Sequence, residues 1–160
     1  MPRPSPIPAF IVLAGSAVAL GGALVAQYGF GLKPCNLCLA QRVPFVLAGL
    51  CALALLSPLP SVRTGRLLLA LAGLVFLVNS GIAFYHVGVE QHWWVSLVCS
   101  GEPIGPLSVE DVLNQMSKPV EVRCDQPQWA WHGITMAAFN IVYSGGLALI
   151  TLTLARRRPG

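Results

Sequence analysis

Four cysteines in two pairs and one arginine are the residues of this chain that could carry out chemistry. Cys35 and Cys38 are separated by two residues, and Arg42 follows four residues after the second of them. A Cys-x-x-Cys pair can close a small disulfide, hold a metal ion or take part in thiol–disulfide exchange. Cys99 and Cys124 form a second, wider pair. The spacing of the first pair alone does not decide between these three uses.

The first cysteine pair precedes an apolar run from Val43 to Leu56, which predicts that Cys38 lies in the first turn of a helix. The free N–H groups and the dipole at a helix start favour an anion such as a thiolate. Arg42, at i+4 from Cys38, is expected to project from the same face and to favour the thiolate further. The arginine therefore shifts the interpretation from a structural disulfide towards redox chemistry.

The composition is that of an integral membrane protein. Of the 160 residues, 55% are hydrophobic and 10% are charged, whereas soluble domains are about a quarter charged. The chain has no long run of charge, and no GxGxxG or P-loop pattern is present. We therefore expect one membrane domain over residues 1–160, with membrane lipid around it and no nucleic-acid partner.

Four apolar segments are long enough to cross a bilayer, for which about 20 helical residues suffice. The spans are expected over about 8–28, 38–57, 67–86 and 130–154, with outward loops over about 29–37 and 87–129. Ala17-Val18-Ala19 resembles a signal-peptide cleavage site, but the uncharged run around it is too long for a signal peptide. The predicted fold class is an all-α, polytopic four-helix bundle.

The basic residues predict the orientation of the chain. Six of the ten Lys and Arg residues lie on the side shared by both termini and the middle loop, and the positive-inside rule makes this side cytoplasmic. The long loop carries all six acidic residues against Lys118 and Arg123, and it faces outward with both cysteine pairs. In a Gram-negative bacterium that side is the periplasm, where disulfides persist. The tryptophans that flank the loop form a predicted aromatic belt: Trp93, Trp94, Trp129 and Trp131.

A short amphipathic helix is predicted inside the long loop. It begins near Leu107 and ends before Pro119, with Ser108 as N-cap, Asp111 as an acid in the first turn and Val112 packing against Leu107. Such a helix would lie on the membrane surface or on top of the bundle.

Other polar or sulfur-bearing residues have structural interpretations. Asn79 and Ser80 are expected to make interhelical hydrogen bonds within the membrane. Cys51, inside the second span, is expected to be a small buried hydrophobic residue. His92 and His132 are expected to be interface residues without a chemical role.

The wide cysteine pair admits more than one interpretation. A structural disulfide worth about 3–4 kcal/mol is the simplest, and a four-cysteine zinc site is disfavoured because such sites use two close pairs. Two disulfides on one face also suggest a relay of electrons through mixed disulfides. A quinone dissolved in the bilayer could end the relay, because it would reach Cys38 and Arg42 and the arginine would stabilise the developing negative charge. His86, at the outer end of the third span, is a second candidate donor to it.

The ordered set of motifs resembles the DsbB family, the membrane disulfide-bond formation proteins that reoxidise DsbA. The resemblance covers nearly the whole chain and rests on these positions: Cys35-Asn36-Leu37-Cys38 followed by Arg42, the pair Cys99 and Cys124, Tyr85-His86, and Trp129, Gly133, Met136 and Asn140 at the entry to the fourth span. Ala40-Gln41 departs from the family's pattern, which has an aromatic residue and an acid before the arginine.

The resemblance implies a bound ubiquinone or menaquinone and a soluble, periplasmic, DsbA-like partner of the thioredoxin fold. It implies that the partner's thiolate attacks Cys99 and that Cys35 exchanges with the wide pair. Cys38 would face the quinone as a thiolate, and Arg42 and His86 would line the quinone site. No metal is implied, and the protein would lie in the bacterial inner membrane with both termini in the cytoplasm.

Two alternatives stay open. Proteins of the vitamin K epoxide reductase type also combine a four-helix bundle with a Cys-x-x-Cys pair and quinone chemistry. In those proteins the loop cysteines precede the close pair, whereas here Cys35 and Cys38 come first. A non-enzymatic membrane scaffold would instead keep both disulfides as permanent structural bonds.

Overall fold

A computed structural model describes residues 5–58, 60–95 and 122–156 of the chain. The elements, in chain order, are α1 (Ile7–Leu24), the π-helical turn η1 (Val25–Gly29), α2 (Asn36–Ala40), α3 (Arg42–Leu56), α4 (Val62–Glu90), strands β1 (Ala130–Trp131) and β2 (Ile134–Thr135), and α6 (Met136–Arg156). The predicted loop helix near Leu107 lies outside the described residues, as does Cys99.

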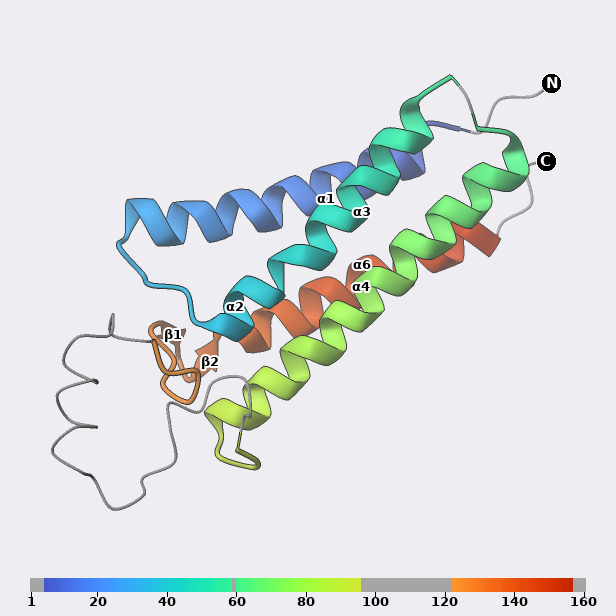
Figure 1. Ribbon diagram of the computed structural model, residues 1–160. Coiled ribbons are helices and arrows are strands. Elements are labelled where there is room, and N and C mark those ends of the chain that lie inside the picture. The colour runs from blue at the N-terminus through green and yellow to red at the C-terminus, as the bar shows by residue number, and fades with distance from the viewer. Residues whose placement is uncertain (1–4, 59, 96–121, 157–160) are drawn as a thin grey trace, which may run out of the picture.

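The described part of the chain holds four helical segments that are long and apolar enough to cross a membrane: Ile7–Gly29, Asn36–Leu56, Val62–Glu90 and Met136–Arg156. The predicted all-α, four-helix membrane fold is therefore confirmed. In Figure 1 the long helices run alongside one another, and the start of α1, the end of α3, the start of α4 and the end of α6 lie at one end of the bundle. The opposite end, called the cysteine end below, carries α2, the β-hairpin and the end of α4.

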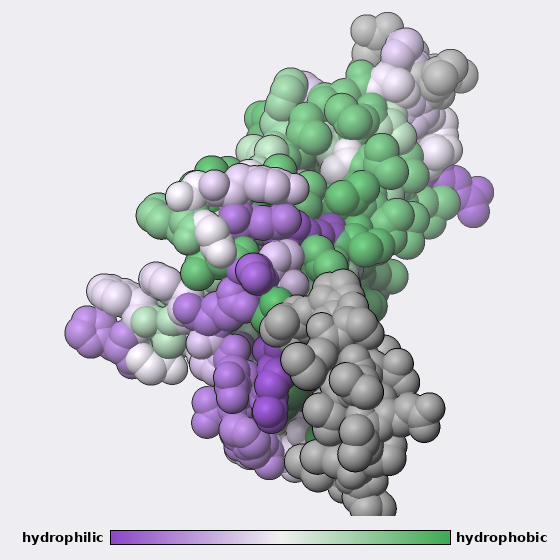
Figure 2. Space-filling model, turned by 60° about the vertical axis from the view of Figure 1, so that its left-hand side comes forward, coloured by the Kyte–Doolittle hydropathy of each residue, from purple (hydrophilic) through white to green (hydrophobic). Residues whose placement is uncertain are grey.

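The outside of the bundle is apolar, as expected for a protein surrounded by lipid. Large side chains such as Leu50, Leu67 and Val142 are more than half exposed. Figure 2 shows hydrophobic side chains covering the helical body, while hydrophilic ones gather towards the cysteine end. The core between the helices instead contains many small residues, including Ala48, Ala72 and others of α3, α4 and α6. Small residues let helix backbones approach closely where no hydrophobic effect drives association.

A break at Gln41 separates α2 from α3. Pro44 has no N–H to donate to the carbonyl of Ala40, and its ring would clash with that carbonyl in a continuous helix. The helix that carries the first cysteine pair therefore ends after five residues, and Arg42 starts a new one.

The observed helices differ from the expected spans at their ends. α4 begins at Val62, because the hydroxyl of Ser61 caps it by accepting a hydrogen bond from the Thr64 N–H at 3.3 Å. α6 begins at Met136 rather than near residue 130, because residues 130–135 form the hairpin. The two-residue turn of the hairpin, His132 and Gly133, has φ angles of 49° and 83°, the left-handed values that such tight turns require.

The expected interhelical hydrogen bonds of α4 are confirmed. The Asn79 amide donates to the Ser144 hydroxyl at 2.9 Å, and the Ser80 hydroxyl donates to the carbonyl of Ile141 at 3.0 Å. Cys51 is a free thiol that packs, half-buried, against the hydrophobic core. The hydrogen bonds of Asn79 and Ser80 join α4 to α6, and α4 also packs along α3.

Two glycines of α4 provide a test of this close packing. A Cβ at Gly73 would lie 2.7 Å from Cγ of Leu152 and 3.3 Å from its backbone N, whereas a Cβ at Gly81 would meet nothing within 4 Å. We expect Gly73→Ala to destabilise the protein by about 1–3 kcal/mol, the usual cost of overpacking. Gly81→Ala, the matched control, should be neutral or stabilising because alanine favours helix. Thermal unfolding in detergent measures both, and equal midpoints for the two variants would contradict this packing.

Candidate functional site

The first cysteine pair forms the start of α2. Cys35 is the N-cap, with an extended backbone, and its sulfur accepts a hydrogen bond from the Cys38 N–H at 3.3 Å. The prediction that Cys38 lies in the first helical turn is therefore confirmed. Both residues are free cysteines, and their sulfurs lie 2.8 Å apart.

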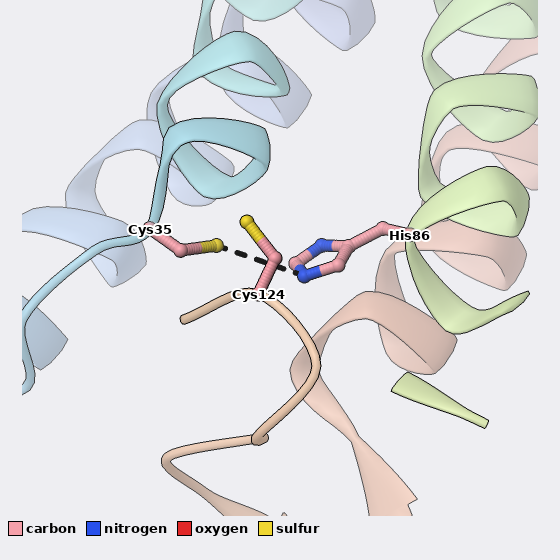
Figure 3. A group of neighbouring side chains, drawn as sticks. All are labelled: Cys35, His86 and Cys124. Atoms are coloured by element: carbon pink, nitrogen blue, oxygen red, sulfur yellow. Dashed lines mark hydrogen bonds between the residues drawn. The ribbon is translucent and has the colours of Figure 1, made fainter. Parts of the chain in front are cut away.

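Three segments that are distant in sequence bring their side chains together at Cys35. Nε2 of His86, on α4, lies 3.6 Å from the Cys35 sulfur. Figure 3 shows these two side chains with Cys124, which comes from the segment before β1. The Cys35 sulfur, the His86 nitrogen and the Cys124 sulfur all lie within 4.8 Å of one another, and all three residues are buried. We call these three residues the exchange cluster.

The redox states of the cysteines differ across this cluster. Cys124 is disulfide-bonded, while Cys35 and Cys38 are not. Two cysteines and a histidine at this distance could hold a soft metal ion, but a sulfur that is bonded to another sulfur is not the thiolate ligand that such an ion needs. The geometry instead places a disulfide sulfur beside a free thiol, which is the arrangement required for thiol–disulfide exchange.

Hydrogen bonds favour the thiolate form of Cys35. The pKa of its thiol is lowered from 9.0 to about 4, chiefly by the hydrogen bond from the Cys38 thiol. Burial acts in the opposite direction, and the hydrogen bond with His86 lowers the pKa further. The resemblance implied a thiolate at Cys38, but in this state of the protein the donors converge on Cys35.

Arg42 does not bond directly to either sulfur. Its guanidinium donates to the side-chain oxygen of Gln27 at 2.8 Å and to the carbonyl of Ala23 at 3.5 Å. Within residues 5–58, 60–95 and 122–156 it has no carboxylate at salt-bridge distance. The arginine thus has neutral partners there, so that its positive charge is available to an anion.

A cavity of about 460 Å³ joins these groups at the cysteine end of the bundle. Cys38, Arg42 and His86 line it together. Its other walls include apolar side chains of α3 and α6: Phe45, Met136 and Phe139. Its size is within the range of small-molecule sites, and a mostly apolar wall with a few polar groups is typical of them.

Sequence reasoning missed two further sets of buried polar residues. Gln41 is buried and bonds to both His86 and Asn140. Glu90 is also buried, lies 3.8 Å from Nε2 of His86 and accepts a hydrogen bond from the Thr135 hydroxyl at 2.6 Å. Both residues could have been found from the sequence, because polar side chains inside apolar spans are costly and are therefore usually functional.

Comparisons with known proteins agree with the geometry. The family model described as "Disulfide bond formation protein DsbB" matches residues 6–154. The chain is 32% identical over 159 residues to Disulfide bond formation protein B of Chromobacterium violaceum, covering 92% of this chain and 91% of the relative. It is 30% identical over 159 residues to the protein of that name from Hahella chejuensis, covering 94% and 91%.

A shorter match, at 34% identity over 94 residues, is to the Disulfide bond formation protein B of Neisseria gonorrhoeae, and it covers 59% of this chain and 56% of that protein. No solved structure matches the chain. The match of the family model over nearly the whole chain, together with two relatives aligned over more than nine-tenths of their length, shows that this chain belongs to the DsbB family of membrane disulfide bond formation proteins.

Proposed function

We propose that this protein reoxidises a DsbA-like dithiol protein of the periplasm and passes the electrons through its two cysteine pairs to a membrane quinone. The observation that carries the proposal is the exchange cluster, in which the disulfide-bonded Cys124 lies within 4.8 Å of the free Cys35 beside a cavity lined by Arg42. Family membership supports the disulfide-forming activity. The location proposed is the bacterial inner membrane, with both termini in the cytoplasm.

The first exchange steps consume one disulfide and create another. A thiolate of the partner attacks Cys99, forms a mixed disulfide with it and releases Cys124 as a thiolate. Cys124 then attacks Cys35 of an oxidised Cys35–Cys38 pair, so that a Cys35–Cys124 bond forms and Cys38 leaves as a thiolate. The short distance between the Cys35 and Cys124 sulfurs supports this step. Cys99 lies outside the described residues, and its role comes from the resemblance.

The remaining steps restore the wide pair. The partner's second thiolate attacks the partner's own sulfur in the mixed disulfide. The partner then leaves in its oxidised form, and Cys99 is released as a thiolate. Cys99 attacks Cys124, and Cys35 is displaced as a thiolate. The structure has Cys124 disulfide-bonded and both residues of the close pair free, which is the arrangement expected at this point. Hydrogen bonds from Cys38 and His86 hold the negative charge on Cys35.

The cavity fits a quinone by the chemistry of its walls. Apolar side chains of α3 and α6 suit the ring and tail, and Arg42, without a carboxylate partner in the described part of the chain, suits an oxygen that gains negative charge. A bound quinone would supply the acceptor for two electrons and two protons as Cys35 and Cys38 close their disulfide. Arg42 would orient it, and His86 would donate to the sulfur that reacts.

Replacing Cys38 tests the relay. Cys38→Ser should abolish quinone reduction by the purified protein supplied with a reduced DsbA-like dithiol, while the chain still inserts and folds, because the close pair can no longer form a disulfide. Cys51→Ser is the matched control and should keep normal turnover, since Cys51 lies outside the cavity lining. Quinone absorbance follows the reaction. Full turnover by the Cys38→Ser protein would rule out the mechanism and favour a scaffold with structural disulfides.

Replacing Arg42 tests the quinone site. Arg42→Leu should raise the KM for quinone by about 10- to 100-fold, the effect of losing a charge-assisted hydrogen bond of about 1.5–3 kcal/mol. The KM for the dithiol partner should stay the same. Arg63→Leu, at the opposite end of the bundle, serves as the control. A large change in the KM for the partner with an unchanged KM for quinone would show that Arg42 does not act at the quinone site.

The lowered pKa of Cys35 predicts unusual reactivity of this thiol. In protein that carries Cys51→Ser and has a free close pair, the rate of Cys35 alkylation should follow a titration with its midpoint near 4, well below the ordinary 9.0. The thiolate would then predominate at neutral pH. Cys38→Ala should move the midpoint upward, because the main stabilising hydrogen bond is lost. Mass spectrometry quantifies the alkylated cysteine, and a midpoint near 9 in the presence of Cys38 would contradict the assignment.

A further inference from the structure

A chain of hydrogen bonds connects His86 to polar residues deeper in the bundle. Gln41 Nε2 lies 2.8 Å from Nδ1 of His86, and Gln41 Oε1 lies 2.6 Å from Nδ2 of Asn140. The Oδ1 atom of Asn140 accepts from the Ser144 hydroxyl at 2.8 Å and is approached by Nδ2 of Asn79 at 3.5 Å. α4, α6 and the turn between α2 and α3 each contribute to this polar chain.

The hydrogen bonds of the structure give the polar chain a direction at Gln41. The Asn140 oxygen is occupied by two donors, so its NH₂ group faces Gln41 and donates to the Gln41 oxygen. The NH₂ group of Gln41 must therefore face the ring of His86. An amide nitrogen is a donor without a free lone pair, so Nδ1 of His86 has to accept the hydrogen bond and cannot carry a hydrogen. A neutral imidazole then carries its single hydrogen on Nε2.

The opposite edge of the ring agrees with this assignment. Nε2 faces the Cys35 sulfur at 3.6 Å and Oε1 of Glu90 at 3.8 Å. A thiolate and a carboxylate both accept hydrogen bonds, so a hydrogen on Nε2 satisfies this side of the ring as well. The amide on one side and the anionic groups on the other thus select the same tautomer.

We propose that Gln41, oriented by Asn140, is a positioning residue that holds His86 in its Nε2–H tautomer and thereby directs a hydrogen bond at the Cys35 sulfur. The donor amide disfavours a hydrogen on Nδ1, because two N–H donors would then face one another there. This role concerns the resting protein and needs neither quinone nor partner, and only its purpose in the relay rests on the proposed function.

The identity of residue 41 decides the behaviour of the ring. A carboxylate at this position could only accept from Nδ1, so it would draw a hydrogen onto that nitrogen. His86 would then either adopt the Nδ1–H tautomer or carry a hydrogen on both ring nitrogens. Glutamine has nearly the same shape but the opposite hydrogen-bonding sense towards the ring.

Nitrogen NMR of histidine tests the proposal directly. The protein is labelled with ¹⁵N-histidine in a His92→Gln, His132→Gln background, where His86 is the remaining histidine of the chain. At neutral pH, in the protein that keeps Gln41, the spectrum of His86 should show an unprotonated Nδ1 and a protonated Nε2. A protonated Nδ1 in this protein would overturn the proposal.

Two variants at position 41 extend the test. Gln41→Glu should give a protonated Nδ1 at neutral pH. Gln41→Met, which keeps the length but removes the donor, should let Nδ1 carry the hydrogen in part of the protein. Ser80→Ala is the matched control, since it removes another α4–α6 hydrogen bond and leaves the polar chain intact. If Nδ1 stays unprotonated in Gln41→Glu, or if all three variants give the same nitrogen spectrum, Gln41 does not control the ring.

Other groups that titrate near the ring have to be held constant in this comparison. Cys35 and Cys38 face it from the start of α2, Glu90 from its own helix, Cys124 from the segment before β1, and Arg42 shares the cavity. All of them are the same in the wild type and in the three variants. In the Gln41 variants, an unchanged nitrogen spectrum would count against Gln41 whether or not quinone reduction is lost. A changed spectrum with full quinone reduction would support control of the ring by Gln41 and would count against its purpose in the proposed relay.

Discussion

The approach of the Cys35 sulfur to Cys124 and His86 depends on contacts between segments that lie far apart in the chain. Each segment is held separately. Cys35 is fixed as the cap of α2 by the Cys38 N–H, and the ring of His86 is held by Gln41 at 2.8 Å. The hairpin beyond Cys124 is tied to α4, because Thr135 donates to Glu90 and also accepts from the first turn of α6. These separate contacts together bring the Cys35 sulfur, the His86 nitrogen and the Cys124 sulfur within 4.8 Å of one another.

Surrounding lipid explains why these polar groups bond to one another. A polar atom within the hydrocarbon layer finds no water, so its partner has to come from the protein. The same condition gives Asn79, Ser144 and Asn140 their mutual hydrogen bonds, and it gives Arg42 its contacts with Gln27 and a backbone carbonyl. The lipid around the bundle thus accounts both for the apolar exterior and for the hydrogen-bonded polar chain inside.

The features that were predicted from the sequence depend on local pattern. Four long apolar runs predicted four spans, and the start of an apolar run after Cys35 placed Cys38 in a first helical turn. Asn79 and Ser80 were recognised as interhelical donors because a polar residue in a span has few other uses. The hairpin was missed because Trp129 to Thr135 is apolar enough to resemble a helix start, although His132-Gly133 is a possible turn.

The missing features are pairings across long sequence separations. Gln41 meets His86 across 45 residues and Asn140 across 99, and no property of either residue alone names its partner. Arg42 was expected to share a helical face with Cys38, but the break at Gln41 separates them into two helices and Arg42 bonds to α1 and η1 instead. A single sequence fixes which residues are polar, while the packing of the helices decides which of them touch.

The π-helical turn η1 makes the length of the first helix part of the site. A bond from the Phe30 N–H to the Val25 carbonyl spans five residues rather than four, and wide turns of this kind correspond to one additional residue in an α-helix. The turn η1 thus holds one residue more than an ordinary helical turn. Deleting one residue other than Gln27 between Val25 and Gly29 would therefore allow an ordinary helix while the loop that leads to Cys35 keeps its place. Within α1 there is no such additional residue, and a deletion there would rotate every later residue of the helix by about 100°, including Gln27, which accepts the hydrogen bond from Arg42. A one-residue deletion in α1 would therefore act as an active-site mutation, although it changes none of the reactive residues.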